Sequence, residues 1–122
     1  MSWDASLTDD RGHREGEWNY THNTNEMIDT ALVESGIDTS ELATAWFGHR
    51  CWWDLLNGSD GPTGAAILDR IITQMEADPD RYRAMNPPNG WGQFDGEYGI
   101  LAVLRHMRSA VPEWPTIWKV SG

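Results

Sequence analysis

The fold is decided first at the N-terminus, where residues 2–8 read SWDASLT. Apolar and polar side chains alternate here, so Trp3, Ala5 and Leu7 fall on one face, which is the period of a strand with one buried side. Residues 9–12, DDRG, supply turn chemistry, and residues 16–20, GEWNY, form a second extended run. The pattern predicts an antiparallel hairpin at the start of the chain.

Two helical patterns follow this hairpin. The polar segment 21–25 supplies Thr and Asn caps for a helix that begins near Glu26 and ends at Gly36. Its expected buried residues are Met27, Ile28, Ala31 and Leu32. Residues 39–56 are a second helical candidate, rich in aromatic side chains, with a break expected at Gly48 because glycine weakens a helix by about 1 kcal/mol relative to alanine.

The clearest helix covers residues 66–77, after a loop at 57–62. Its apolar residues recur at helical spacing and are Leu68, Ile71, Ile72 and Met75. A short helical turn is expected at 78–85, and residues 86–92 must be a loop because they contain two prolines and two glycines. A last helix is expected from about 94 to 110.

The C-terminal stretch 116–120, TIWKV, predicts a final strand. It is expected to join the hairpin, because an isolated terminal strand would leave its backbone groups unpaired. The sum is an α+β fold in which a small antiparallel sheet, the N-terminal hairpin plus the C-terminal strand, packs against three or four helices. Residues 1–122 are predicted to form a single globular domain, since no linker or repeat interrupts them.

Composition indicates a strongly acidic, tryptophan-rich chain. The net charge is −10, from 19 acidic and 9 basic residues. Such a field repels nucleic acids and anionic membranes, so neither is expected as a partner. Acidic charge instead suits solubility or docking on a basic protein. The chain has eight tryptophans, more than a core of this size needs, so one or two are expected to line a binding site, and spare tryptophan surface also allows a homodimer.

The sequence offers little for metal, cofactor or covalent chemistry. Cys51 is the single cysteine, and His49 beside it gives at most two of the three or four ligands that zinc needs. No secretory signal and no apolar run near the roughly 20 residues of a membrane span is present, so a cytoplasmic location is expected. Residues 61–66, GPTGAA, place glycines at a helix start, which indicates either a phosphate site or a helix with proline in its first turn. We expect no cofactor, no metal and no catalytic residue.

Two polar segments are the best candidates for a binding site. Residues 19–25, NYTHNTN, lie where a strand gives way to a helix, and residues 86–96, NPPNGWGQFDG, form a stiff loop. The candidate ligand-binding residues in and beside them are Asn19, Thr21, His22, Asn23, Arg83, Asn89, Trp91 and Asp95. The alternative interpretation is local: Asn and Thr cap helices and turns, and Trp91 fills the core.

The same segments carry a resemblance that covers nearly the whole chain. The pattern Asn19-Tyr20-Thr21-x-Asn23 followed by a methionine, and the pattern YRAMNPxNGWG at residues 82–92, resemble a family of small uncharacterised proteins of actinobacterial phages and their hosts. Many of those proteins have a Met-Trp pair where this chain has Met27-Ile28, so any role of that tryptophan is not carried over. The resemblance implies a setting, that of a phage accessory protein in a bacterial host cell, and no mechanism.

Together, these features predict a non-enzymatic phage accessory protein that binds, and sequesters, a small nucleotide-derived signal of host defence. A flat ring would stack on Trp91, Asn and Thr side chains would read its polar edges, and Arg83 would neutralise phosphate. The alternative is an acidic protein-interaction module that inhibits a host protein. A third hypothesis, an enzyme with His22 as general base, requires turnover and a bell-shaped pH profile.

Overall fold

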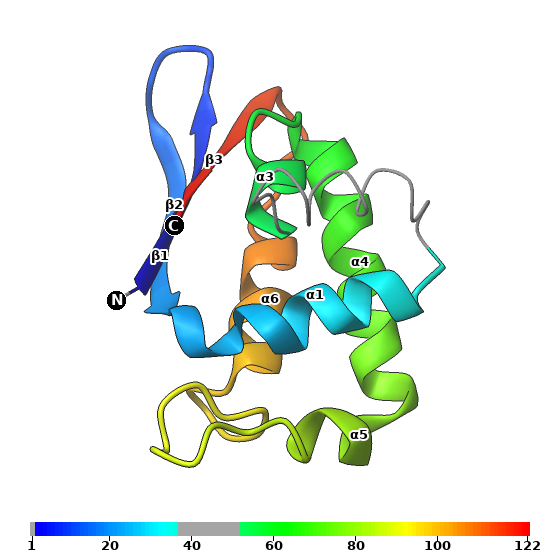
Figure 1. The fold of residues 1–122 in the computed structure, drawn as a ribbon. Coiled ribbons are helices and arrows are strands. Elements are labelled where there is room, and N and C mark those ends of the chain that lie inside the picture. The colour runs from blue at the N-terminus through cyan, green and yellow to red at the C-terminus, as the bar shows by residue number, and fades with distance from the viewer. Residues whose placement is uncertain (1, 37–51) are drawn as a thin grey trace.

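The structure is a computed structural model, and it describes residues 2–36 and 52–122. Strand β1 (Ser2–Asp9) is the central strand of a three-stranded sheet. It pairs antiparallel with β2 (Arg14–Thr21) on one side and with β3 (Thr116–Ser121) on the other, giving the order β2-β1-β3 (Figure 1). The predicted α+β fold, with an N-terminal hairpin joined by a C-terminal strand, is confirmed.

Alternation along the strands gives the sheet one apolar face. In β1, Trp3, Ala5 and Leu7 are all buried, as predicted. In β3, Trp118 and Val120 are buried, and the strand register places them opposite Leu7 and Ala5 respectively. The apolar rows of neighbouring strands therefore align, and the helices cover this face.

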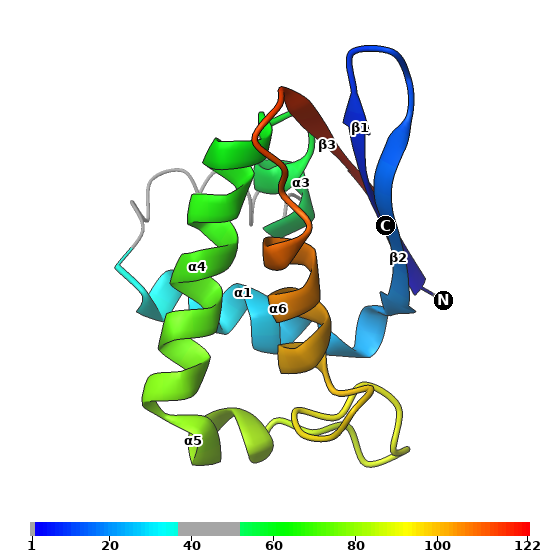
Figure 2. The same ribbon diagram turned by 180° about the vertical axis from the view of Figure 1, so that it is seen from behind.

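The described residues contain five α-helices, two of them only five residues long. They are α1 (Asn25–Glu34), α3 (Trp52–Leu56), α4 (Gly61–Ala77), α5 (Pro79–Arg83) and α6 (Ile100–Ser109). The 3-10 turn η1 (His22–Thr24) precedes α1. Helix α4 packs against both α1 and α6, and Figure 2 shows α4 and α6 side by side. None of these helices is long and apolar enough to cross a membrane.

The core is built from aromatic side chains. Trp3, Trp52 and Trp118 have no exposed surface, and Trp3 meets Trp52 edge to face with their ring centroids 5.0 Å apart. The Trp52 indole N–H donates to Asn25 Oδ1 over 3.1 Å, and the Trp118 indole N–H donates to the carbonyl of Gly61 over 3.3 Å. Trp52 and Trp118 thus bring their one polar group to a partner, whereas the buried Nε1 of Trp3 has no hydrogen-bond partner among the described residues.

The segment between α3 and α4 covers the outer edge of β3. The N–H of Gly58 donates to the Trp118 carbonyl over 2.8 Å, and the N–H of Trp118 donates to the Ser59 carbonyl over 2.9 Å. The Asn57 side chain accepts from the N–H of Val120 over 3.0 Å. These bonds satisfy backbone groups that an edge strand would otherwise present to another chain.

Two helix starts differ from the prediction. Helix α4 begins at Gly61 instead of residue 66, because Asp60 caps it by accepting from the N–H of Thr63 over 2.8 Å and Pro62 stands in its first turn. Helix α6 begins at Ile100 instead of residue 94. The cause is Gly96, whose φ of 105° lies outside the helical region.

The predicted helix over 39–56 is described only at its end. Residues 52–56 form α3, as expected, whereas residues 39–51, including the break expected at Gly48, lie outside the described residues. Gly36 follows the end of α1 with a φ of 85°, so the predicted stop at this glycine is confirmed.

The contact between α4 and β3 gives a first prediction. A Cβ added at Gly64 would lie 2.2 Å from Cδ1 of Trp118 and 2.8 Å from Cδ1 of Leu56. We expect Gly64→Ala to lower the free energy of unfolding by about 1–2 kcal/mol, because overpacking strain outweighs the gain of about 1 kcal/mol in helix propensity. Urea denaturation measures the change. Ala66→Gly, at an exposed position of the same helix, isolates the propensity effect, and a Gly64→Ala variant that gains stability would contradict the close packing.

Asp29 gives a prediction for pH. Burial raises the pKa of its carboxyl from 3.8 to about 6; the hydrogen bond from the N–H of Trp52, 2.8 Å long, opposes this rise, and the nearby charge of Asp54 adds to it. Because the pKa is higher in the folded state, protonation of Asp29 stabilises that state. This stabilisation is fully present below the unfolded pKa of 3.8, and it is lost as the pH rises through about 6.

Asp29→Asn cannot ionise but keeps an oxygen that accepts from Trp52. The stability of the variant relative to wild type should therefore rise between pH 4 and pH 7 by up to about 3 kcal/mol. Urea unfolding of both proteins at the two pH values measures the difference. A difference that does not change with pH would contradict the assignment to Asp29.

Candidate functional site

A cavity of about 1090 Å³ lies where the end of β2 meets the loop that precedes α6. Its walls come from two segments far apart in the sequence, 19–23 and 89–99. The lining residues are Ser2, Asn19, Tyr20, Thr21, His22, Asn23, Asn89, Gly90, Trp91, Gly92, Gln93, Asp95, Gly96, Glu97, Tyr98 and Gly99. The volume is that of a pocket for a small organic molecule.

Seven of the eight residues predicted from the sequence line this cavity, namely Asn19, Thr21, His22, Asn23, Asn89, Trp91 and Asp95. The eighth, Arg83, is not a lining residue. The two polar segments singled out in the sequence are therefore brought together by the fold. Their shared place in one cavity is a fact of geometry, and binding by these residues stays a prediction.

Direct bonds join the two segments. The Asn23 side-chain N–H₂ donates to Asn89 Oδ1 over 3.4 Å and approaches the Trp91 carbonyl at 3.5 Å. Asn89 Oδ1 also accepts from the N–H of Trp91 over 3.0 Å, which tightens the turn. The Asn23 bonds are long, so they align the segments more than they hold them.

Close backbone packing does hold them. Gly92 has a φ of 86°, and a Cβ on it would lie 2.8 Å from Cγ2 of Thr24 and 3.0 Å from Cγ2 of Thr21. A left-handed φ and a contact this close both require glycine. The loop therefore packs directly against η1 at Gly92, where only glycine permits so close an approach.

Trp91 stands out from the loop. Its side chain is 70% exposed, and that of Tyr98, which lines the same cavity, is 80% exposed. The alternative in which Trp91 fills the core is therefore wrong, and Phe94, which is 1% exposed, supplies the core residue of this loop. Two large rings are left free at the rim of one cavity.

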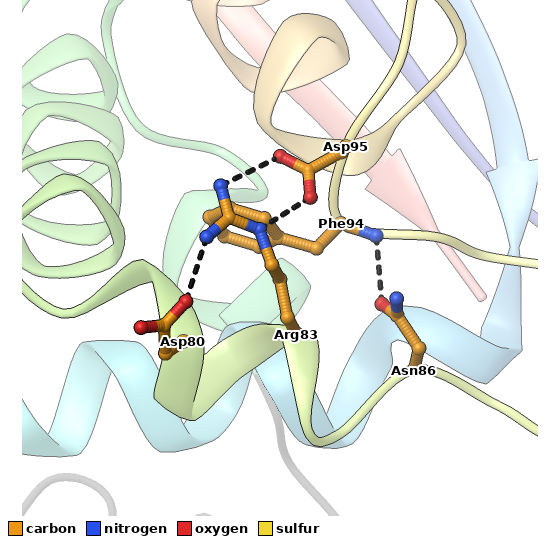
Figure 3. Close-up of polar contacts among 5 residues, drawn as sticks. All are labelled: Asp80, Arg83, Asn86, Phe94 and Asp95. Atoms are coloured by element: carbon orange, nitrogen blue, oxygen red, sulfur yellow. Dashed lines mark hydrogen bonds and ion pairs between the residues drawn. The ribbon is translucent and has the colours of Figure 1, made fainter.

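Arg83 clamps the loop from outside the cavity (Figure 3). Its guanidinium binds Asp95 through both Nε and Nη2, and its Nη1 donates to Asp80 Oδ1 over 2.8 Å. Its guanidinium carbon lies 5.4 Å from the centroid of the Phe94 ring, and Asn86 Oδ1 accepts from the N–H of Phe94 over 2.8 Å. The Arg83 hydrogen bonds hold the pKa of Asp95 below its usual range, so the pair is fully charged. Arg83 is thus a positioning residue, occupied by two carboxylates.

The cavity wall is acidic. Asp95 and Glu97 contribute carboxylates, and no Lys or Arg occurs among the described residues that line it. The pKa of Tyr20 is raised by burial, and its hydroxyl donates to the Tyr98 carbonyl over 2.5 Å. The His22 ring stacks on Trp53 with the centroids 5.7 Å apart, and its Nε2 has no hydrogen-bond partner in the described part of the chain.

Two of the predicted contacts already have structural partners. The Asn19 side-chain N–H₂ donates to Asp4 Oδ1 over 2.7 Å and to Ser2 Oγ over 3.0 Å. Thr21 Oγ1 accepts from the N–H of Asn23 over 3.3 Å, which caps η1 as the capping interpretation expects. These side chains shape the wall. Asn23 and Asn89 are likewise engaged, by the bonds that join the two segments, and Asp95 is engaged by Arg83.

Two lining residues, Tyr20 and Gln93, lie in the predicted segments but were not among the eight candidate residues, and two others, Glu97 and Tyr98, lie outside those segments. Residues 97 and 98 were placed inside a predicted helix, which hid their position in an exposed loop. Of the two interpretations of residues 61–66, the structure shows the helix with proline in its first turn, and the carboxylate of Asp60, which caps this helix terminus, would repel an anion.

The chemistry of the cavity is assigned from its residues. Comparison of the chain with models of protein families, with curated proteins and with solved structures found no match. In the described part of the chain, no group of three or more His, Cys, Asp or Glu could hold a metal ion. The pair His49 and Cys51 weighed in the sequence lies outside the described residues.

The contact at Gly92 predicts how the cavity can be disrupted. Gly92→Ala and Gly90→Ala both place a side chain at positive φ, which costs about 1–2 kcal/mol, but a Cβ at Gly90 meets nothing within 4 Å. Gly92→Ala should therefore be about 1–3 kcal/mol less stable than Gly90→Ala, because its Cβ would overlap with Thr24 and Thr21. Urea denaturation of the two variants measures the difference. Equal losses would show that the loop does not press on η1.

Proposed function

We propose that this protein is a non-enzymatic binding protein that sequesters a small nucleotide-derived molecule in the cavity. The observation that carries the proposal is the pair of exposed rings, Trp91 and Tyr98, on the rim of a cavity of about 1090 Å³. Stacking of a nucleobase on an aromatic ring stabilises binding by roughly 1–3 kcal/mol. Asn23 Nδ2 and Asn89 Oδ1 are used in the bonds between the segments, so the other atoms of these two amides, Asn23 Oδ1 and Asn89 Nδ2, supply an acceptor and a donor for the edge of a base.

The charge of the wall decides which part of the ligand enters. A phosphate inside would meet the carboxylate of Glu97, and that of Asp95, whose charge Arg83 already offsets, without a Lys or Arg among the described lining residues to pair with it. A ribose suits the same place, because carboxylates accept hydrogen bonds from its hydroxyl groups. The base and sugar therefore enter the cavity, and any phosphate faces solvent.

The setting comes from the sequence. The segments that line the cavity are the ones that resemble small proteins of actinobacterial phages, NYTHN at 19–23 and NPPNGWG at 86–92. A phage protein that captures a nucleotide signal in the cytoplasm of its host would blunt the defence that depends on it. Sequestration of this kind needs affinity and abundance, and it needs no catalytic group.

Thermal unfolding with a panel of nucleosides, nucleotides, cyclic nucleotides and ADP-ribose derivatives tests the proposal. A ligand at about 100 times its dissociation constant adds about 2.7 kcal/mol to stability, which raises the melting temperature by roughly 5–15 °C in a domain of this size. We expect a shift with at least one compound and a nucleoside to bind at least as well as its polyphosphate. A panel with no shift would contradict ligand binding and leave the acidic interaction module.

Matched variants locate the effect. Trp91→Ala should abolish the shift, whereas Trp114→Ala, which removes another exposed tryptophan outside the cavity, should retain it. Mass spectrometry of the ligand after incubation should find it unchanged. Conversion to a product that is lost in His22→Gln would instead identify an enzyme.

A further inference from the structure

We propose that a second surface, at the opposite end of the molecule from the cavity, docks an extended, arginine-bearing segment of a partner protein. This surface is a groove of about 590 Å³ between the hairpin turn, the start of α4 and residues 112–117. Figure 1 shows the hairpin turn and the start of β3 at one end and the loop before α6 at the other. The proposal does not depend on the proposed function of the cavity.

The groove has a fixed apolar wall. Trp114 is 54% exposed and Ile117 is 43% exposed, although both are large apolar residues. Pro112 and Pro115 flank Trp114 and restrict the backbone around it. The Trp114 indole N–H donates to Glu15 Oε1 of β2 over 3.1 Å, which fixes the ring. A partner would therefore find an aromatic platform whose conformational entropy is already reduced.

Carboxylates surround this platform. The lining includes Asp9, Asp10, Asp60 and Glu113, and no Lys, Arg or His occurs among the described residues of the groove. Asp9 accepts from the backbone of the hairpin turn and lies 3.5 Å from His13 Nδ1, and Asp60 caps α4. Asp10 and Glu113 neither accept from the hairpin turn nor cap a helix, so their charges are available to a partner.

Arginine is the side chain that matches both the aromatic platform and the carboxylates around it. Its planar guanidinium stacks on an indole face and donates to carboxylates at the same time, and its aliphatic stem covers apolar surface. Thr116, which lines the groove, is 3% exposed, and its hydroxyl oxygen has no hydrogen-bond partner among the described residues. The carboxylates do not form a group that could hold a metal ion, and the net charge of −10 disfavours nucleic acid.

Fluorescence anisotropy with a short fluorescein-labelled peptide of alternating alanine and arginine tests the groove, at an ionic strength of about 0.15 M. The same peptide with citrulline in place of arginine, which keeps the shape without the charge, is the ligand control. We expect Trp114→Ala to weaken binding of the arginine peptide by roughly 3- to 30-fold. The double variant Asp10→Asn/Glu113→Gln should weaken it by about threefold or more.

Two control proteins separate the groove from the general charge of the chain. Trp91→Ala removes an exposed tryptophan elsewhere, and Glu26→Gln/Asp78→Asn removes the same two charges at exposed positions outside the groove. Both should stay within about twofold of wild type, with circular dichroism confirming that every variant is folded. Two outcomes with the variants overturn the proposal: the two double charge variants weaken binding equally, or Trp114→Ala has no effect. Two outcomes with the peptides also overturn it: the citrulline peptide binds as tightly as the arginine peptide, or the arginine peptide has a dissociation constant above about 1 mM.

Discussion

The fit of Trp118 against the first two turns of α4 is the contact on which the rest of the structure depends. Its ring occupies the space that Gly64 leaves open, and its indole N–H reaches the carbonyl of Gly61. Its backbone bonds to Gly58 and Ser59 cover the edge of β3. One residue therefore joins the sheet, the longest helix and the segment before that helix, and it does so without leaving its polar group unpaired.

The two proposed binding surfaces follow from this union of sheet and helices. One end of the sheet delivers residues 19–23 to the loop before α6, and the other end delivers the hairpin turn to the start of α4. In each place, an exposed tryptophan is held by a local device. The loop that carries Trp91 is fixed by the close contact at Gly92 and by the Arg83–Asp95 ion pair. Trp114 lies between two prolines, and its indole N–H donates to Glu15.

The sequence predicted the strands, the buried faces and the loop at 86–92 because these depend on periodicity and on proline and glycine, which act locally. It also predicted seven lining residues of one cavity, since polar clusters at strand ends are visible in the sequence. It assigned Arg83 to a ligand phosphate, whereas in the structure Arg83 pairs with Asp80 of its own helix and with Asp95 of the loop, and the second pairing depends on how the loop folds back. It likewise placed Tyr98 in a helix, because a buried Phe94 continues the helical spacing through the turn at Gly96.

Charge distinguishes the two surfaces in a way that composition alone does not. The excess acid is a property of the whole chain, yet at the cavity one carboxylate, Asp95, is already neutralised by Arg83. At the groove, no comparable cation lies beside Asp10 and Glu113 among the described residues that line it. The cavity thus suits a ligand bound by stacking and hydrogen bonds, whereas the groove suits a cation. Because the Trp114 ring is already held by Glu15 and loses little entropy on binding, the groove can gain affinity from a small number of contacts.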